Sequence, residues 1–229
     1  MTIARAHLVD PSVTRWYHCV TRCVRRAFLL GEGMHDRKTW IEHRLEELAE
    51  IFSVAVAGFA ILDNHLHLLV RLDPEVAQGW SDEDVVRRWG RLFPPRDKAR
   101  QVVPISDEWV QARLKDARWV ATARQRLQSL TWFMKCLKEP LSLLANREEQ
   151  TRGAFFEGRF KSVAILFAAS RARLREVAER LGVHHLDRAL NPLPDRNQNH
   201  WGEIGQPRLL CATKEVARPR FLRALSQWT

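Results

Sequence analysis

The chain has 229 residues, and 45% of them are hydrophobic, which is enough for one packed domain with elaborations or a tail. No apolar run approaches the roughly 18 residues of a membrane-spanning helix, so we expect no membrane-embedded part. Lysine and arginine total 37 against 27 acidic residues, and the resulting net charge of +10 favours a polyanionic partner.

The four cysteines, at positions 19, 23, 136 and 211, do not form a metal-binding pattern. Reduced thiols are the simpler interpretation, and they are typical of a cytoplasmic protein. The first residues include Arg5, His7 and Asp10 and lack the apolar core of a signal peptide. We therefore expect a cytoplasmic location.

The first part of the chain predicts a strand, a helix and then two paired strands. A β-rich run comes first, a helical spacing of apolar residues follows with Asp36 as N-cap, and Asp63 and Asn64 form a tight turn between the two later strands. In order, these elements cover residues 16–24, 36–52, 53–62 and 65–72. The order predicts an α+β fold with a ferredoxin-like βαββαβ antiparallel sheet.

A helical insertion is predicted over about 80–148, with Ser81 as the N-cap of its first helix and a break or kink near Pro140. Residues 156–161 alternate between apolar or small and charged side chains, which predicts a last strand that runs on to residue 166. We therefore expect one domain over 1–166 and a divergent, basic tail over 167–229.

His65 and His67 lie two residues apart in a predicted strand. Side chains on a strand alternate between two faces, so both imidazoles should point to the same side while Leu66 and Leu68 point to a core. Two imidazoles on one face supply half of a divalent-metal site. The alternative is that they are polar residues on a solvated sheet face, and the spacing alone leaves both interpretations open.

Basic residues gather at two places beside these strands. Arg22 and Arg25 end the first strand, as a rim that faces either phosphates or solvent. Arg159 and Lys161 lie on the charged side of the last strand, where we expect them to contact DNA phosphates near the histidines. A solvent-facing charged strip is the alternative.

Three stretches stand out together: residues 17–22 (YHCVTR), 64–69 (NHLHLL) and 156–162 (FEGRFKS). In this order they resemble the IS200-like, REP-associated tyrosine transposases, a branch of the single-tyrosine HUH endonucleases. The corresponding family motifs read Y-H-x-T-x-R, N-H-x-H-L-L and F-x-G-R-F-K-S.

The resemblance implies a partner, a cofactor and a reaction. The partner is single-stranded or hairpin DNA, and the cofactor is Mg²⁺ or Mn²⁺ held by His65 and His67. The reaction is strand cleavage and joining through phosphotyrosine, in DNA transposition and recombination. Relatives act as dimers or as monomers, so a homodimer is left open.

The chain departs from the family at the nucleophile. The family's tyrosine lies on a helix after the last strand, in a Y-I-x-x-N-P motif, and residues 167–181 contain no tyrosine. The chain's one tyrosine, Tyr17, lies on the first strand, where packing is its expected role. Asn191, before Pro192, matches only the end of the motif and is a candidate third metal ligand. The family's activity is therefore in doubt for this chain.

Three explanations remain open for the missing tyrosine. The gene has changed reading frame near residue 166, or the protein is a domesticated relative that binds DNA without cutting it, or Tyr17 serves as the nucleophile. Outside the family's chemistry, the alternatives are a non-catalytic nucleic-acid-binding module on a sheet like that of RNA-recognition domains, and a hydrolase that uses metal-bound water.

Overall fold

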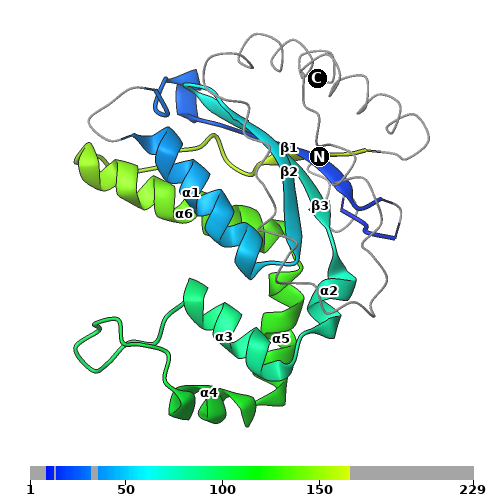
Figure 1. Cartoon of the computed structure of the whole chain (residues 1–229). Coiled ribbons are helices and arrows are strands. Elements are labelled where there is room, and N and C mark those ends of the chain that lie inside the picture. Colours follow the sequence, from blue (N-terminus) through cyan, green and yellow to red (C-terminus); the bar gives the residue numbers. More distant parts are fainter. Residues whose placement is uncertain (1–8, 13, 32–35, 166–229) are drawn as a thin grey trace. The chain divides into compact units, whose positions relative to one another are not determined.

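The computed structural model of the chain describes residues 9–12, 14–31 and 36–165 (Figure 1). The chain divides into two compact units. The sheet unit takes its described residues from Met1–Trp40, Val56–Arg71 and Arg152–Thr229, and the helical unit comprises Ile41–Ala55 and Leu72–Thr151.

The described residues form one four-stranded sheet, ordered β2-β3-β1-β4 (Figure 1). Strand β1 lies between β3 and β4 and is antiparallel to both. The bounds are Trp16–Arg22 for β1, Val54–Ile61 for β2, His65–Leu72 for β3 and Lys161–Ala164 for β4. This order is that of a ferredoxin-like sheet, and the α+β prediction is confirmed.

The turn between β2 and β3 sets the register of this hairpin. The Leu62 amide donates to the His65 carbonyl at 2.9 Å, so only Asp63 and Asn64 lie between the paired ends of the two strands. Asp and Asn are favoured in such short hairpin turns because they tolerate the required backbone conformations. The Asp63 carbonyl in turn accepts from the Leu30 amide at 2.7 Å, so the turn is fixed from outside as well.

One face of the sheet belongs to the apolar core. Tyr17, Cys19, Leu66, Leu68 and Val70 alternate along β1 and β3, and none is more than 2% exposed. A shift of register by one residue would move this whole set to the other face, so burial holds the strands in place.

Helix α1 spans Arg37–Ile51, and Asp36 caps it as predicted, because its Oδ1 accepts from the Thr39 amide at 3.0 Å. A 3₁₀ turn, η2, spans Val24–Arg26. The other helices are α2 (Pro74–Gly79), α3 (Asp82–Leu92), α4 (Asp107–Leu114), α5 (Ala117–Leu127) and α6 (Leu130–Glu148). Of the helices that the described residues form, none is long and apolar enough to cross a membrane.

Side-chain caps start the inserted helices. Ser81 and Asp84 form a capping box at α3, in which each side chain binds the other's backbone amide. Ser106 and Asp116 accept from backbone amides at the starts of α4 and α5. The predicted N-cap at Ser81 is therefore confirmed, and the caps satisfy amides that have no partner inside the helix.

Of the two outcomes predicted near Pro140, the break is wrong, because α6 continues through this residue. Proline has no amide hydrogen, so the carbonyl of Cys136, four residues earlier, loses its helical partner. The Arg44 side chain replaces it, with Nε donating to the Cys136 carbonyl at 3.2 Å. A long-range side chain thus offsets the cost of proline inside the helix.

This arrangement predicts a coupled effect on stability. Arg44→Met should lower the free energy of unfolding by about 1–3 kcal/mol, because a carbonyl at a buried residue is left without a donor. In the Pro140→Ala background the restored amide can bind Cys136 itself, so the same change should cost markedly less. The coupling is measured by urea denaturation of four proteins: the unchanged chain, the two single variants and the double variant. Equal costs in both backgrounds would show that the carbonyl contact does not matter.

The last strand is shorter than predicted. Strand β4 covers only Lys161–Ala164, and before it Phe156 forms a single isolated bridge to Cys23. Gly158 interrupts the pairing because its φ of +128° lies outside the extended region of a strand. Phe155 and Phe156 are both buried, which a regular alternation would not allow. The predicted tail, 167–229, lies outside the described residues.

Candidate functional site

The pairing of β1 with its neighbours brings the predicted histidines and two of the basic residues to one side of the sheet. Arg22 is paired with His65, and Val20 is paired with His67 on one side and with Lys161 on the other. Directly paired residues share a face. We call this side, opposite the apolar core, the histidine face.

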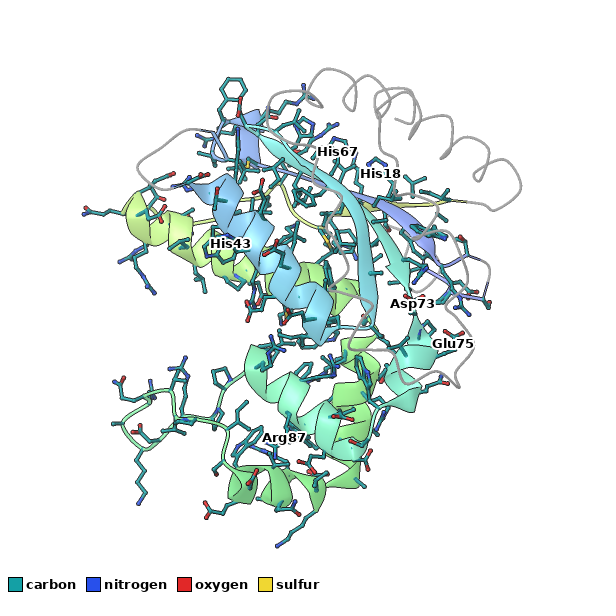
Figure 2. All side chains as sticks on the ribbon, in the orientation of Figure 1. His18, His43, His67, Asp73, Glu75 and Arg87 are labelled. Carbon is teal, nitrogen blue, oxygen red and sulfur yellow. The ribbon has the colours of Figure 1, made fainter. Side chains whose placement is uncertain are left out.

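A third histidine lies on the same face. His18 Nε2 and His67 Nδ1 are 2.9 Å apart, and the two rings are nearly parallel, at 12° (Figure 2). The His65 ring lies 4.9 Å from that of His67, centroid to centroid. His18 is 4% exposed and His67 is 5% exposed, whereas His65 is partly exposed. The accessible member of this cluster is therefore His65.

The cluster is uncharged near neutral pH. Burial lowers the pKa of His18, and burial together with the charge of Arg22 lowers that of His65. His67 combines burial with repulsion from His18, His65 and Arg22, and its pKa falls to about 3. Neutral imidazoles keep a lone pair, which is what a metal ion or a hydrogen-bond donor requires.

Asn64 determines how His65 is oriented. Its side-chain nitrogen donates to the Arg26 carbonyl at 3.1 Å, so its oxygen accepts from His65 Nδ1 at 2.6 Å. This assignment places the proton of His65 on Nδ1 and leaves the lone pair on Nε2. An orienting oxygen behind the ring is the usual arrangement for a ligating histidine.

His65 and His67 are the two predicted ligands of a divalent ion, and their rings lie next to each other. His67 can offer Nε2 when its Nδ1 donates to His18, which then acts as the acceptor. Within the described residues, no three His, Cys, Asp or Glu side chains are arranged to hold a metal. Asn191, the predicted third ligand, lies outside the described residues. Metal binding therefore stays a prediction.

The four predicted DNA-contacting residues lie in three settings. Arg22 ends β1 beside His65, and Lys161 is exposed at the start of β4 in the same row as His67. Arg25 is exposed in η2, immediately after β1. Arg159 is exposed but precedes β4, so no strand pairing assigns it to the histidine face. The sheet itself brings together Arg22, Lys161 and the histidines.

Tyr17, the chain's one tyrosine, lies on the opposite face of β1. It is 0% exposed, and its hydroxyl donates to the Thr14 carbonyl at 2.9 Å. Burial raises its pKa, which disfavours the phenolate that a nucleophile needs. The geometry is that of a packing residue.

Two residues of the site were not predicted from the sequence. His18 was missed because its contact with His67 depends on the strand register, although its two-residue spacing from Val20 and Arg22 already put all three on one face. Asn64 was predicted as a turn residue and as the first residue of the N-H-x-H-L-L motif, without a role beside His65. Its position directly before His65 was the available signal for its second role.

No protein-family model matches the chain, and no curated protein sequence matches it significantly. Among solved structures, a REP-associated tyrosine transposase bound to a REP hairpin is similar to this chain, with a TM-score of 0.40 and 11% sequence identity. The match covers 80% of this chain and 72% of that chain. A likeness of this size carries no conclusion about function.

Proposed function

We propose that this chain is a transposase-like protein that binds single-stranded or hairpin DNA on the histidine face of its sheet. The observation that carries the proposal is the row of Lys161, His67 and His65 with Arg22, formed by the register of three strands. Cations on one rigid face suit a phosphate backbone, since their charge is already in place, and the neutral imidazoles beside them keep lone pairs for a metal ion.

His65 Nε2 and His67 would hold the divalent ion that the family resemblance implies. Imidazole nitrogen suits Mn²⁺ better than Mg²⁺, which prefers an all-oxygen shell. A bound ion would polarise a phosphate oxygen as a Lewis acid. His18 and Asn64 would hold the two ligating rings in orientation, through their contacts with His67 and His65.

A second candidate, DNA binding without strand cleavage, is favoured by one observation. The only tyrosine of the chain is fully buried on the face opposite the histidines. A phosphotyrosine intermediate would require Tyr17 to leave the core and to cross the plane of the sheet. We therefore propose that DNA binding persists in this chain without phosphotyrosine chemistry.

The test uses the full chain with a labelled DNA hairpin that has a single-stranded flank, in the presence of Mn²⁺. We expect a salt-sensitive complex on a native gel, stronger than with a blunt duplex, and no covalent band on a denaturing gel. His65→Ala and Tyr17→Phe are the matched variants. A covalent adduct lost with Tyr17→Phe would contradict the account, as would the absence of any complex. Cleavage without an adduct, lost with His65→Ala, would indicate a hydrolase.

A further inference from the structure

The segment that follows β1 is tied to the sheet unit by backbone hydrogen bonds. The Cys23 amide donates to the Asn64 carbonyl at 2.8 Å, and the Val24 amide donates to the Phe155 carbonyl at 3.0 Å. At its far end, the Leu30 amide donates to the Asp63 carbonyl. We call residues 24–30 the arginine turn. Its first residue is fixed to the chain before β4, and its last residue is fixed to the hairpin between β2 and β3.

The backbone of the arginine turn is strained. Arg25 and Arg26 have φ values of 54° and 55°, in the left-handed region that residues with a Cβ rarely occupy. Two successive arginines in this conformation persist only where the surroundings hold them. Strain of this kind is common at ligand-binding sites, where it fixes side chains in place.

The side chain of Phe28, within the arginine turn, is 75% exposed. Its carbonyl accepts from the Gly31 amide at 3.0 Å, and a Cβ at Gly31 would lie only 3.0 Å from that oxygen, so glycine permits the tight return of the chain. Phe28 is thus an exposed aromatic ring on a fixed backbone, beside two exposed arginines.

Phe28 differs from other aromatic residues of the described chain in having an open ring face. Trp16, Trp80 and Trp132 each carry a guanidinium over the ring, at 5.8, 4.1 and 4.5 Å from the centroid. In the part of the chain that the structure describes, no other ring and no cation lies over Phe28. An uncovered aromatic face beside cations is what an unpaired base stacks on.

Asn64 joins the arginine turn to the histidine face. Its one amide group donates to the Arg26 carbonyl and accepts from His65 Nδ1. The turn that presents Phe28 and the ring of His65 are therefore held by the same side chain. A strand of nucleic acid lying against His65 has the arginine turn directly beside it.

We propose that Phe28 is a stacking platform for an unpaired base, with Arg25 and Arg26 binding the phosphates that flank this base. The inference rests on the proposed function and narrows it: the partner must expose at least one unpaired base at the turn between β2 and β3. An uncharged apolar protein segment would use Phe28 but would have no use for the two arginines.

The test is fluorescence anisotropy of the full chain with two labelled probes. One is a mixed-sequence strand of about 20 nucleotides, longer than the roughly 4–16 that a small domain covers, and the other is an abasic strand of equal length. Phe28→Ala should weaken binding of the base-bearing strand by about five- to a hundredfold, which corresponds to one lost stacking contact. Binding of the abasic strand should change by less than about twofold.

Two further variants complete the test. Phe28→Trp keeps an aromatic face and should restore binding, while Leu143→Ala removes another exposed apolar side chain, 66% exposed on α6, and should have no effect. An equal loss on both probes, or no loss with Phe28→Ala, would overturn the inference while leaving the proposed function intact. If the unchanged chain binds neither probe, the proposed function fails as well.

Discussion

Lys161→Glu is expected to weaken binding of single-stranded DNA about tenfold or more and to flatten its salt dependence. Lys161 is the exposed cation in the same row as His67, at the start of β4. Each phosphate contact with a single strand contributes about −0.7 to the slope of log affinity against log salt. Reversing the charge removes one contact and adds repulsion, so both the affinity and the slope should fall.

The matched control is Lys98→Glu, which makes the same charge change at an exposed residue of the helical unit, between the bridged Arg96 and Val102. Affinity measured at several salt concentrations separates the two variants. If both weaken binding equally, net charge alone attracts the DNA and the histidine face has no special role. Arg22→Glu should behave like Lys161→Glu, because Arg22 lies two residues along β1 from Val20, the residue that pairs with Lys161.

The second large effect is on stability in acid. His67 stays neutral in the folded chain down to about pH 3, because burial and its cationic neighbours lower its pKa. In the unfolded chain it takes up a proton near pH 6.5. Between these two values the unfolded state binds more protons, so stability is lost as the pH falls, by up to about 1.4 kcal/mol per pH unit.

His67→Gln should remove this contribution. The free energy of unfolding of the variant, measured in urea from neutral pH to pH 5, should fall less steeply than that of the unchanged chain. His43→Gln, at an exposed position of α1 (Figure 2), should leave the slope as it is. Equal slopes for all three proteins would mean that His67 titrates normally and that the cluster is open to water.

The sequence was sufficient to predict those features that depend on local periodicity. Alternation along 65–72 predicted that His65 and His67 lie on one face of the strand and Leu66 and Leu68 on the other, and the Asp63-Asn64 turn predicted the hairpin. A two-residue period is a property of the strand itself and needs no knowledge of the neighbouring chain.

The features that could not be predicted depend on contacts between distant residues. The contact of His18 with His67 follows from the register of β1 against β3, which no local pattern contains. Helix α6 passes Pro140 because Arg44, about ninety positions away in the sequence, donates to Cys136. The late start of β4, after Gly158, reflects a positive φ that glycine permits but does not require.

The most direct test of the central claim is photo-crosslinking of a single-stranded DNA that carries iodinated bases, followed by mass spectrometry of the linked peptides. The histidine face and the arginine turn predict crosslinks in peptides from residues 16–30, 62–71 and 156–165. Crosslinks confined to α3–α6, with none in those peptides, would contradict the account and would move the DNA-binding surface to the helical unit.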